Sequence, residues 1–363
     1  MADPRIRLVV LYGGQSAEHD VSCISAAHVV RALDPQRYEI DAVAITPDGR
    51  WVRSAEVQRA LRAGPAELPA TLDATGGEVD PRPTLTPDAD RQVVVLPVLH
   101  GPRGEDGSVQ GLLELLDVPY VGTGVLGSAL NMDKAMAKTV AAAAGLPIVR
   151  HLAVRDAAVD DTLAARVDTE LGWPVFVKPA NMGSSVGVSK ATDAAQLRAA
   201  VATATALDEW VVLEEAVTAR EIEVGVIGNE EPRASVPGEI VPTHDFYDYD
   251  DKYLDGAAEM IVPADLPADV AEQARHLALR AYAALRCDGL ARVDFFYEET
   301  APGGGPGRGL LFNEINTMPG FTPYSMFPSL WAATGLDYGA LLDELVRLAV
   351  ARHRHRAPHR RLA

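Results

Sequence analysis

The chain has 363 residues, of which 48% are hydrophobic and 23% are charged. This composition excludes a disordered or fibrous protein, and the length allows two or three domains. Asp and Glu number 51 against 33 Lys and Arg, which gives a formal net charge of −18. Because so acidic a protein repels nucleic-acid phosphates and anionic lipids, we expect neither nucleic acid nor membrane among its partners.

Lysine is scarce in this chain. Of the 33 basic residues, 28 are arginine and five are lysine. An ammonium is a compact charge on a flexible stem, whereas a guanidinium is a wide planar fork, so the two differ where a cation must fit among phosphate oxygens. Some of the lysines are therefore candidates for phosphate contacts, and the alternative is that all lie on solvated surfaces. The five are Lys134, Lys138, Lys178, Lys190 and Lys252.

Cysteine usage and hydropathy indicate the compartment. Cys23 and Cys287 stand in no pairing or metal-binding motif, which is typical of a reducing compartment. The apolar run near the N-terminus is too short for a signal peptide, and no later stretch approaches the roughly 18 apolar residues of a membrane span. We therefore expect a soluble, cytoplasmic protein.

The first third of the chain alternates strands and helices. Apolar, β-rich runs at 5–12, 38–45 and 92–99 predict strands, and a helical pattern covers about 21–33. A further helix is expected after the loop HGPRGEDG. This alternation predicts a parallel sheet covered on both faces. The Pro-, Ala-, Gly- and Asp-rich stretch at 54–91 is expected to be an insertion or a loosely ordered surface loop.

The pattern changes after about residue 122, where we place a domain boundary. One helix is expected from about Ser128 to Gly145, followed by strands, a helix at 268–286 and two late strands joined by a Gly- and Pro-rich turn. This part is α+β rather than regularly alternating. The tail after residue 350 carries five Arg and three His and is expected to be a solvated, frayed terminus.

A Gly- and Ser-rich loop, 183–187, follows the strand that ends near Lys178. Glycines let backbone N–H groups approach an anion, and serine hydroxyls add donors, so the loop is a candidate phosphate cover. The alternative is an ordinary tight loop, since the P-loop pattern GxxxxGK[ST] is absent.

Two late strands carry acids that share a face. Glu314 and Asn316 are two residues apart, and Asp294 can meet them from the neighbouring strand, with Arg292 on its own face. Oxygen ligands of this kind suit Mg²⁺. The alternative is a pair of half-exposed strands that present polar residues to solvent.

Three other segments are candidates for function. The aromatic and acidic run 243–256, which contains Lys252, is either a catalytic lid or a solvated loop. Glu18 and His100 follow strands of the first domain, at the edge where open α/β sheets bind ligands. Glu18 could pair with a ligand ammonium there or simply begin a helix.

Seven segments in order make the chain resemble the D-alanine–D-alanine ligases, which are ATP-grasp carboxylate–amine ligases. The segments are LYGGQSAEHDVS, LHGPRGEDGSVQGLLE, GSALNMDKAMAK, FVKPANMGSSVGVSK, DFYDYDDKY, ARVDFF and NEINTMPGFTPYSM. The resemblance implies an N-terminal doubly wound parallel-sheet domain followed by a two-lobed ATP-grasp fold. The implied divisions are 1–122, 123–214, 215–350 and a basic tail, 351–363.

The resemblance also implies roles for individual residues. ATP contacts are expected from Lys134, Lys178, Gly183, Ser185, Glu214, Glu215, Val217, Glu221 and Lys252. Catalytic roles are expected for Glu18, Ser184, Tyr253, Arg292 and Gly320, and substrate contacts for His100, Ser325 and Met326. Two Mg²⁺ ions, or Mn²⁺, would be held by Asp294, Glu314 and Asn316. Lys138 and Lys190 match no such role and are expected to be ordinary surface residues.

The implied activity is ligation of two D-alanine molecules for peptidoglycan precursor synthesis, through an acyl phosphate, with release of ADP and phosphate. Lys252 and Tyr253 match the lid of relatives that form the dipeptide. A D-lactate or D-serine acceptor, or a non-catalytic nucleotide-binding relative, are the alternatives. A homodimer is expected from the family. One departure is Asn181-Met182, where an acidic residue is frequent, and this leaves the anchoring of the 183–187 loop open.

Overall fold

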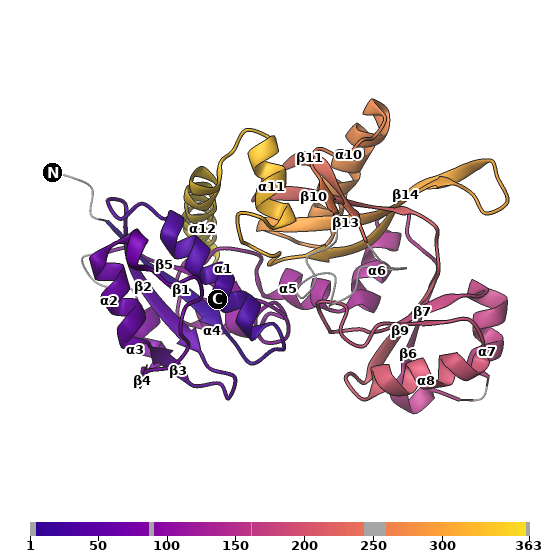
Figure 1. Cartoon of the computed structure of the whole chain (residues 1–363), viewed down its shortest axis with the longest axis horizontal. Helices are drawn as coiled ribbons and strands as arrows, with labels where there is room; N and C mark the ends of the chain where they lie inside the picture. The colour runs from indigo at the N-terminus through magenta and orange to yellow at the C-terminus, as the bar shows by residue number, and fades with distance from the viewer. Residues whose placement is uncertain (1–4, 87–90, 161, 243–258, 361–363) are drawn as a thin grey trace.

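The computed structural model describes residues 5–86, 91–160, 162–242 and 259–360, and within these it forms three β-sheets. The N-terminal sheet lies at the left of Figure 1, a central sheet at the lower right and a C-terminal sheet at the upper right. Lys252 and Tyr253 fall outside the described residues. No helix in the described ranges is long and apolar enough to cross a membrane.

The N-terminal sheet has the strand order β4-β3-β2-β1-β5. Its three long strands, β1 (Ile6–Gly13), β2 (Tyr38–Ile45) and β5 (Val93–Leu99), are parallel, as the alternation with helices predicts. The short strands β3 (Trp51–Arg53) and β4 (Gly77–Glu78) extend it with antiparallel pairing. The strands β1 and β5 are almost fully buried because helices cover both faces of the sheet, whereas half of the residues of β2 are only partly buried.

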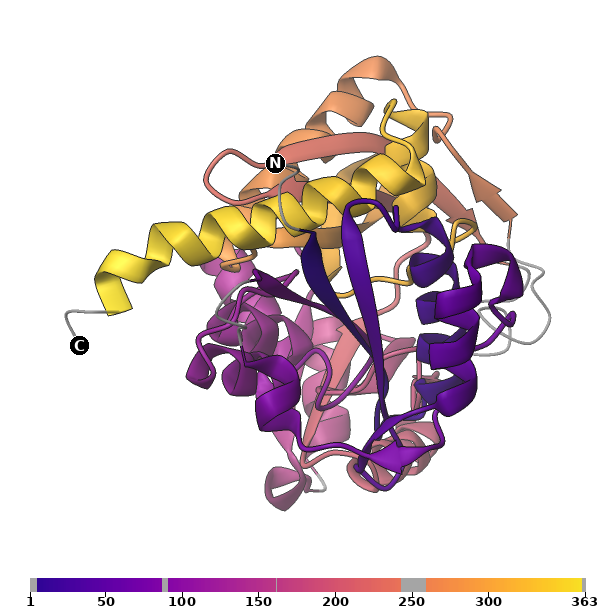
Figure 2. The same cartoon turned by 90° about the vertical axis from the view of Figure 1, so that its left-hand side faces the viewer.

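Helices from both ends of the chain cover this sheet. The helices α1 (His19–Ala32) and α2 (Ala55–Ala63) share one apolar core with the C-terminal helix α12 (Tyr338–Arg360). Figure 2 shows α12, in yellow, running beside the N-terminal strands. The helices α3 (Pro81–Leu85) and α4 (Ser108–Leu115) contribute to the core on the other face.

The expectation of a loosely ordered loop at 54–91 is wrong for the described part of that stretch. Ser54 caps α2 by accepting a hydrogen bond from Val57 N, and Leu72 and Leu85 are buried in the two cores of the N-terminal domain. Burying these apolar side chains stabilises the folded segment, although its composition is rich in Pro and Gly.

The single helix expected after Ser128 is two helices, α5 (Val125–Met132) and α6 (Lys134–Ala143). Asp133 separates them because its side chain accepts hydrogen bonds from Ala135 N and Met136 N, both at 3.0 Å, and so caps α6. The cap fixes the start of the helix that carries Lys134 and Lys138.

The central sheet is antiparallel with the order β6-β9-β7-β8. Its strands are β6 (His151–Arg155), β7 (Val175–Pro179), β8 (Ser189–Ala191) and β9 (Trp210–Glu215). The helices α7 (Leu163–Arg166) and α8 (Ala194–Thr205) share its core. Short helical turns occupy Pro65–Glu67, Asp156–Ala158 and Val167–Leu171.

The C-terminal sheet is also antiparallel, with the order β12-β11-β10-β13-β14. Its main core packs against α10 (Ala268–Ala284), and α11 (Met326–Ala333) follows the last strand. The strands are β10 (Arg220–Gly228), β11 (Arg233–Val241), β12 (Glu259–Ile261), β13 (Gly289–Thr300) and β14 (Pro306–Asn316).

The expectation of a frayed C-terminal tail is wrong for its first residues. The helix α12 continues through them, and Arg352 is only 6% exposed. Its guanidinium lies 4.4 Å from the centre of the Tyr120 ring and donates hydrogen bonds to the carbonyl oxygens of Tyr120, at 2.9 Å, and Gly122. This part of the tail therefore fastens α12 to the segment that leaves the N-terminal domain.

Candidate functional site

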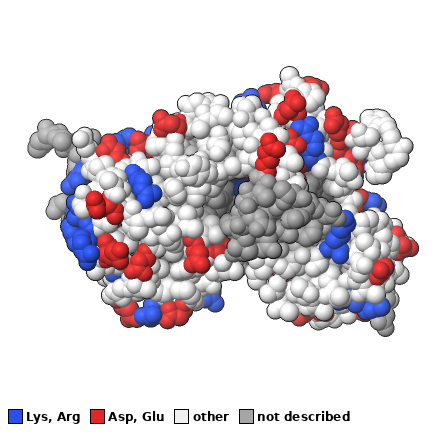
Figure 3. Space-filling model, viewed as in Figure 1, with Lys and Arg blue, Asp and Glu red and all other residues white. Residues whose placement is uncertain are grey.

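A cavity of about 790 Å³ is lined by residues of all three sheets and their connecting loops. Every predicted site residue within the described ranges lines this cavity, from Glu18 and His100 in the N-terminal domain to Ser325 and Met326 at the start of α11. Lys252 and Tyr253, in contrast, lie outside the described residues. Around it, acidic side chains are spread over both the left-hand and right-hand parts of the face in Figure 3.

Glu18 lines the cavity and is 8% exposed. Ser184 Oγ donates a short hydrogen bond to Glu18 Oε1. A side-chain carbon at Gly101 or Gly183 would lie 2.6 or 2.8 Å from Glu18 Oε2, so both glycines are needed for this close approach. The N-terminal domain and the 183–187 loop thus meet around one carboxylate.

The 183–187 loop is anchored by a neighbouring acid. Asn181 N and Nδ2 donate hydrogen bonds of 2.6 and 3.0 Å to Asp208 Oδ2. The residue before the loop is therefore anchored by an aspartate distant in sequence. The loop does not need an acidic residue at position 181 or 182 for this anchoring. Ser184 and Ser185 both have positive φ, 49° and 57°, a conformation that costs energy for residues other than glycine and is common at functional sites.

Three charged side chains form a buried cluster in the wall of the cavity. Glu214 on β9 is 2% exposed, and its Oε2 lies 2.7 Å from Lys178 Nζ on β7. Its Oε1 lies 3.0 Å from Lys138 Nζ on α6. Burial raises the pKa of Glu214, but the charges of Lys138 and Lys178 outweigh it and hold that pKa at about 2.

The expectation that Lys138 is an ordinary surface residue is wrong. Its side chain is 1% exposed, and Nζ also donates a hydrogen bond of 2.8 Å to Asn313 O on β14. Lys190, in contrast, is exposed.

Lys134 opens α6 and lines the cavity. Its Nζ donates a hydrogen bond of 2.6 Å to Met182 O and lies 3.4 Å from Glu314 Oε2. This ammonium therefore connects the loop that contains Ser184 to the acidic strand β14.

The acidic strands meet as the spacing predicts. Asp294 on β13 pairs with Glu314 on β14, and Arg292 pairs with Asn316. Asn316 Nδ2 donates a hydrogen bond of 2.9 Å to Asp294 Oδ2. Within the described part of the chain, no group of three or more His, Cys, Asp or Glu side chains is placed to hold a metal ion. The predicted set offers two carboxylates and one amide.

Arg292 is held by acids on two strands. It donates to both carboxylate oxygens of Asp294, and its Nε lies 2.9 Å from Glu223 Oε2 on β10. Burial lowers the pKa of Arg292, but the charges of Asp294 and Glu223 outweigh it and raise that pKa. Sequence reasoning missed Glu223, although the i, i+2 spacing from Glu221 on β10 places it on the same face of the strand.

Ser325 also lines the cavity, and its Oγ accepts a hydrogen bond of 3.1 Å from Thr322 N. Ser325 Oγ would lie 3.2 Å from a side-chain carbon at Gly320, so the backbone of that residue approaches the serine closely. Met326 begins α11 and packs with Ile240 and Leu330. Gly320, Ser325 and Met326 all line the cavity that Glu18 also lines.

His100 is 5% exposed and connects two elements. Its Nδ1 lies 3.0 Å from Met318 O and 3.7 Å from Glu105 Oε1. Burial lowers the pKa of His100, but the carboxylates of Glu105 and Glu18 outweigh it and raise that pKa. Glu105 was missed at the sequence level, although it lies in the same HGPRGEDG loop.

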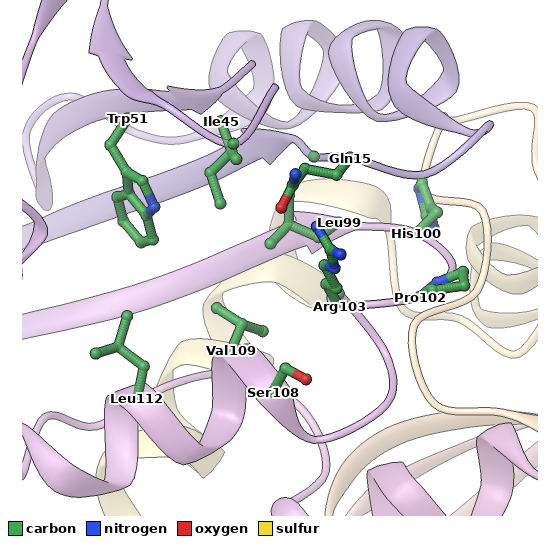
Figure 4. Close-up of a pocket in the computed structure, with 13 residues that line it drawn as sticks. Gln15, Ile45, Trp51, Leu99, His100, Pro102, Arg103, Ser108, Val109 and Leu112 are labelled. Carbon is green, nitrogen blue, oxygen red and sulfur yellow. The ribbon is translucent and has the colours of Figure 1, made fainter. Parts of the chain in front are cut away.

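A second, smaller cavity of about 160 Å³ lies in the N-terminal domain and shares His100 with the first. Figure 4 shows Trp51 and Leu112 at the left of the view and the polar side chains of Gln15 and Arg103 to their right, with Leu99 beside them. None of the remaining predicted site residues lines it.

Comparisons with known proteins agree with this arrangement. Residues 7–123 match the family model described as the D-ala D-ala ligase N-terminus, and residues 140–347 match the C-terminus. A D-alanine–D-alanine ligase of Geobacillus kaustophilus is 44% identical over 97% of this chain and 96% of its own length.

Two solved structures are similar to the whole chain. The D-alanine–D-alanine ligase from Coxiella burnetii has a TM-score of 0.81 at 34% identity and covers 99% of this chain and 97% of its own. The VanG D-Ala:D-Ser ligase from Enterococcus faecalis has a TM-score of 0.78 at 30% identity, with 95% and 100% covered. The chain therefore belongs to the D-alanine–D-alanine ligase family of ATP-dependent ligases.

Proposed function

We propose that this chain joins two D-alanine molecules to form D-alanyl-D-alanine, with ATP converted to ADP and phosphate. The observation that carries the proposal is the single cavity in which Lys134, Lys178, the β13–β14 acids and the Glu18–Ser184 pair come together. Each group has a physical task in such a reaction, and all of them face one space of about 790 Å³.

The phosphate half of the reaction needs positive charge. A carboxylate is a poor electrophile, so the γ-phosphoryl group of ATP is transferred to the carboxylate of the first D-alanine and an acyl phosphate forms. Lys134 and Lys178 would bind the α- and β-phosphates, with the 183–187 loop over the triphosphate and Glu214, Glu215, Val217 and Glu221 around the nucleoside. Lys252, outside the described residues, would contact the γ-phosphate.

Two carboxylates and an amide suit Mg²⁺, which prefers a few protein oxygens completed by phosphate oxygens and water. Asp294, Glu314 and Asn316 would hold two such ions, with Mn²⁺ as a substitute. When bound, Mg²⁺ offsets the negative charge of the phosphate groups during transfer.

The peptide-forming half of the reaction uses residues that the N-terminal and C-terminal parts of the chain bring to the same cavity. Glu18, with Ser184, would bind the ammonium of the first D-alanine, near His100, and Ser325 with Met326 would place the second. The neutral amine of the second D-alanine attacks the acyl carbon, and phosphate leaves. Arg292 and the Gly320 N–H would stabilise the oxyanion that forms between these events. Tyr253, also outside the described residues, would complete the Glu18–Ser184 cluster.

One incubation tests the proposal. The full chain with ATP, Mg²⁺ and D-alanine is expected to release ADP and phosphate and to form a product with the mass of D-alanyl-D-alanine. Adding equimolar D-serine and D-lactate tests the acceptor, which matters because one structural relative is a D-Ala:D-Ser ligase. No ADP release would contradict the ligase, and a mixed-product mass would contradict the choice of acceptor.

We also propose a homodimer and a cytoplasmic location, both expected from the family. Among the described residues, Leu115 and Leu126 are exposed apolar side chains, at 87% and 65%, and are candidates for a contact between copies. Light scattering of the chain before and after Leu115→Asp tests the dimer.

A further inference from the structure

Lys138 is a charged side chain that is almost completely buried. Its side chain is 1% exposed, and its ammonium is fixed by Glu214 Oε1 at 3.0 Å and by Asn313 O at 2.8 Å. Removing an ammonium from water costs several kcal/mol, so it is tolerated only where partners are in place. Lys138 is absent from the residues that line the 790 Å³ cavity, so any effect on ligands must pass through its partners.

The partner that reaches the cavity is Glu214. Its two oxygens are divided between Lys138 and Lys178, and Lys178 Nζ lies 2.7 Å from Oε2. Both Glu214 and Lys178 line the cavity. The cluster of one carboxylate and two ammonium groups therefore has a net charge of +1, with its surplus positive charge on the cavity side.

We propose that Lys138 is a positioning residue for the nucleotide: it is the permanent counter-charge of Glu214 and thereby leaves Lys178 available to the phosphate groups of ATP. Without Lys138, Glu214 and Lys178 would form a neutral pair. A phosphate oxygen would then have to compete with Glu214 for the same ammonium, and separating that pair in the interior is costly. The inference rests on the proposed ATP-binding function.

Two further observations agree with this role. The charges of both lysines hold the pKa of Glu214 at about 2, against the effect of burial, so the carboxylate needs a counter-charge at every working pH. In addition, Lys138 Nζ donates a hydrogen bond to the carbonyl of Asn313, next to Glu314, and its side chain is 1% exposed. A guanidinium is wider and planar, which explains why lysine persists here in an arginine-rich chain.

The test compares the affinity of the full chain for ATP with its affinity for adenosine, by titration calorimetry in the presence of Mg²⁺. Lys138→Met is expected to weaken ATP binding about tenfold and adenosine binding less than about twofold, because only the phosphates use the surplus charge. Lys190→Met, at an exposed lysine, is the matched control and is expected to change neither affinity. Loss of ATP and adenosine binding to the same extent would indicate a merely structural role and overturn the proposal.

A second variant keeps the test decisive if Lys138→Met does not fold. Lys138→Met combined with Glu214→Gln removes both opposite charges, so that Glu214 no longer competes with phosphate for Lys178. The ratio of ATP to adenosine affinity is expected to return to within about twofold of the original chain. A ratio that stays about tenfold lower would overturn the proposal. An unmodified chain that binds no ATP would overturn the proposed function itself, which separates the two failures.

Discussion

Arg292 donates two parallel hydrogen bonds to Asp294, from Nε to Oδ1 at 2.8 Å and from Nη2 to Oδ2 at 2.7 Å. The two residues belong to the same strand. The residues are two apart on β13 and so share a face. Glu223 lies on the other side of Arg292 Nε, at 2.9 Å. If Asp294 binds a cation, as proposed above, Glu223 would keep the guanidinium of Arg292 in place at the cavity.

Replacing this guanidinium is expected to slow the chemical step. Arg292→Lys removes the planar fork and is expected to lower kcat about a hundredfold, because a positioned donor to the developing oxyanion is lost. The KM for ATP is expected to change little. Steady-state assays of ADP release at varied ATP and D-alanine concentrations measure both quantities.

The matched control is an arginine with the same geometry elsewhere. Arg53 donates to both oxygens of Asp41, at 2.8 and 2.7 Å, in the N-terminal sheet. Arg53→Lys is expected to leave kcat within about twofold of the original chain. Similar losses of kcat in both variants would show that the Arg292 effect comes from destabilised packing rather than from its place at the cavity.

Glu18 provides a second prediction, on substrate affinity. Glu18→Gln keeps the size of the side chain and removes its charge, so an ammonium loses a charged partner. The KM for the first D-alanine is expected to rise tenfold or more, about the value of one charge-assisted hydrogen bond, with the KM for ATP unchanged. Glu56→Gln, at an exposed position on α2, is the control. A parallel rise in the KM for ATP would argue against the assignment.

Lysine-to-arginine exchange tests whether the scarce lysines mark sites where only a compact cation fits. Lys134→Arg, Lys138→Arg and Lys178→Arg are each expected to lower kcat/KM for ATP at least about tenfold, since each ammonium has close partners in or behind the cavity. Lys252→Arg is expected to do the same. Lys190→Arg is expected to be silent. Equal tolerance at all five positions would show that lysine scarcity carries no information about function.

Much of the site followed from local patterns. Strand spacing alone placed Asp294, Glu314, Asn316 and Arg292 on one face, because side chains two apart in a strand point the same way. The burial of Lys138 could not be predicted in this way. It depends on how α6 packs between Glu214 on β9 and Asn313 on β14, and such long-range packing leaves no trace in a lysine-containing helix.

The same limit explains the other corrections. The composition of 54–91 indicates a loop, yet Leu72 and Leu85 bind that segment to two cores. The break between α5 and α6 could have been predicted, because aspartate is a favourable N-cap residue and Asp133 caps α6. The helical pattern of the sequence continues across Asp133, however, and indicates one helix.

Acid should weaken the contribution of Glu214 to stability. Its pKa is about 2 in the folded chain, below the ordinary 4.5, so its contribution is complete above about pH 4.5 and is lost as the pH falls through about 2. Glu214→Gln leaves two buried ammonium groups without their counter-charge and is expected to cost about 3–5 kcal/mol at pH 7.

The difference in the free energy of unfolding between the original chain and Glu214→Gln is therefore expected to shrink as the pH falls from 4.5 toward 2. Urea denaturation at a series of pH values measures it. Glu67→Gln, at an exposed glutamate, is the control and is expected to cost little at any pH. A difference that stays constant down to pH 2 would contradict the charge cluster.

Arg352 provides the last prediction, on the attachment of α12. Its guanidinium is buried against the Tyr120 ring and donates to the carbonyl oxygens of Tyr120 and Gly122. Arg352→Met leaves both buried carbonyls without their donor and is expected to lower the free energy of unfolding by about 2–4 kcal/mol. Arg354→Met, two residues on and exposed, is expected to cost less than about 0.5 kcal/mol. Because the same segment connects the N-terminal domain, and hence Glu18, to the rest of the cavity, Arg352→Met is also expected to raise the KM for D-alanine. Equal stability of the two variants in urea would mean that α12 is held by its apolar face alone.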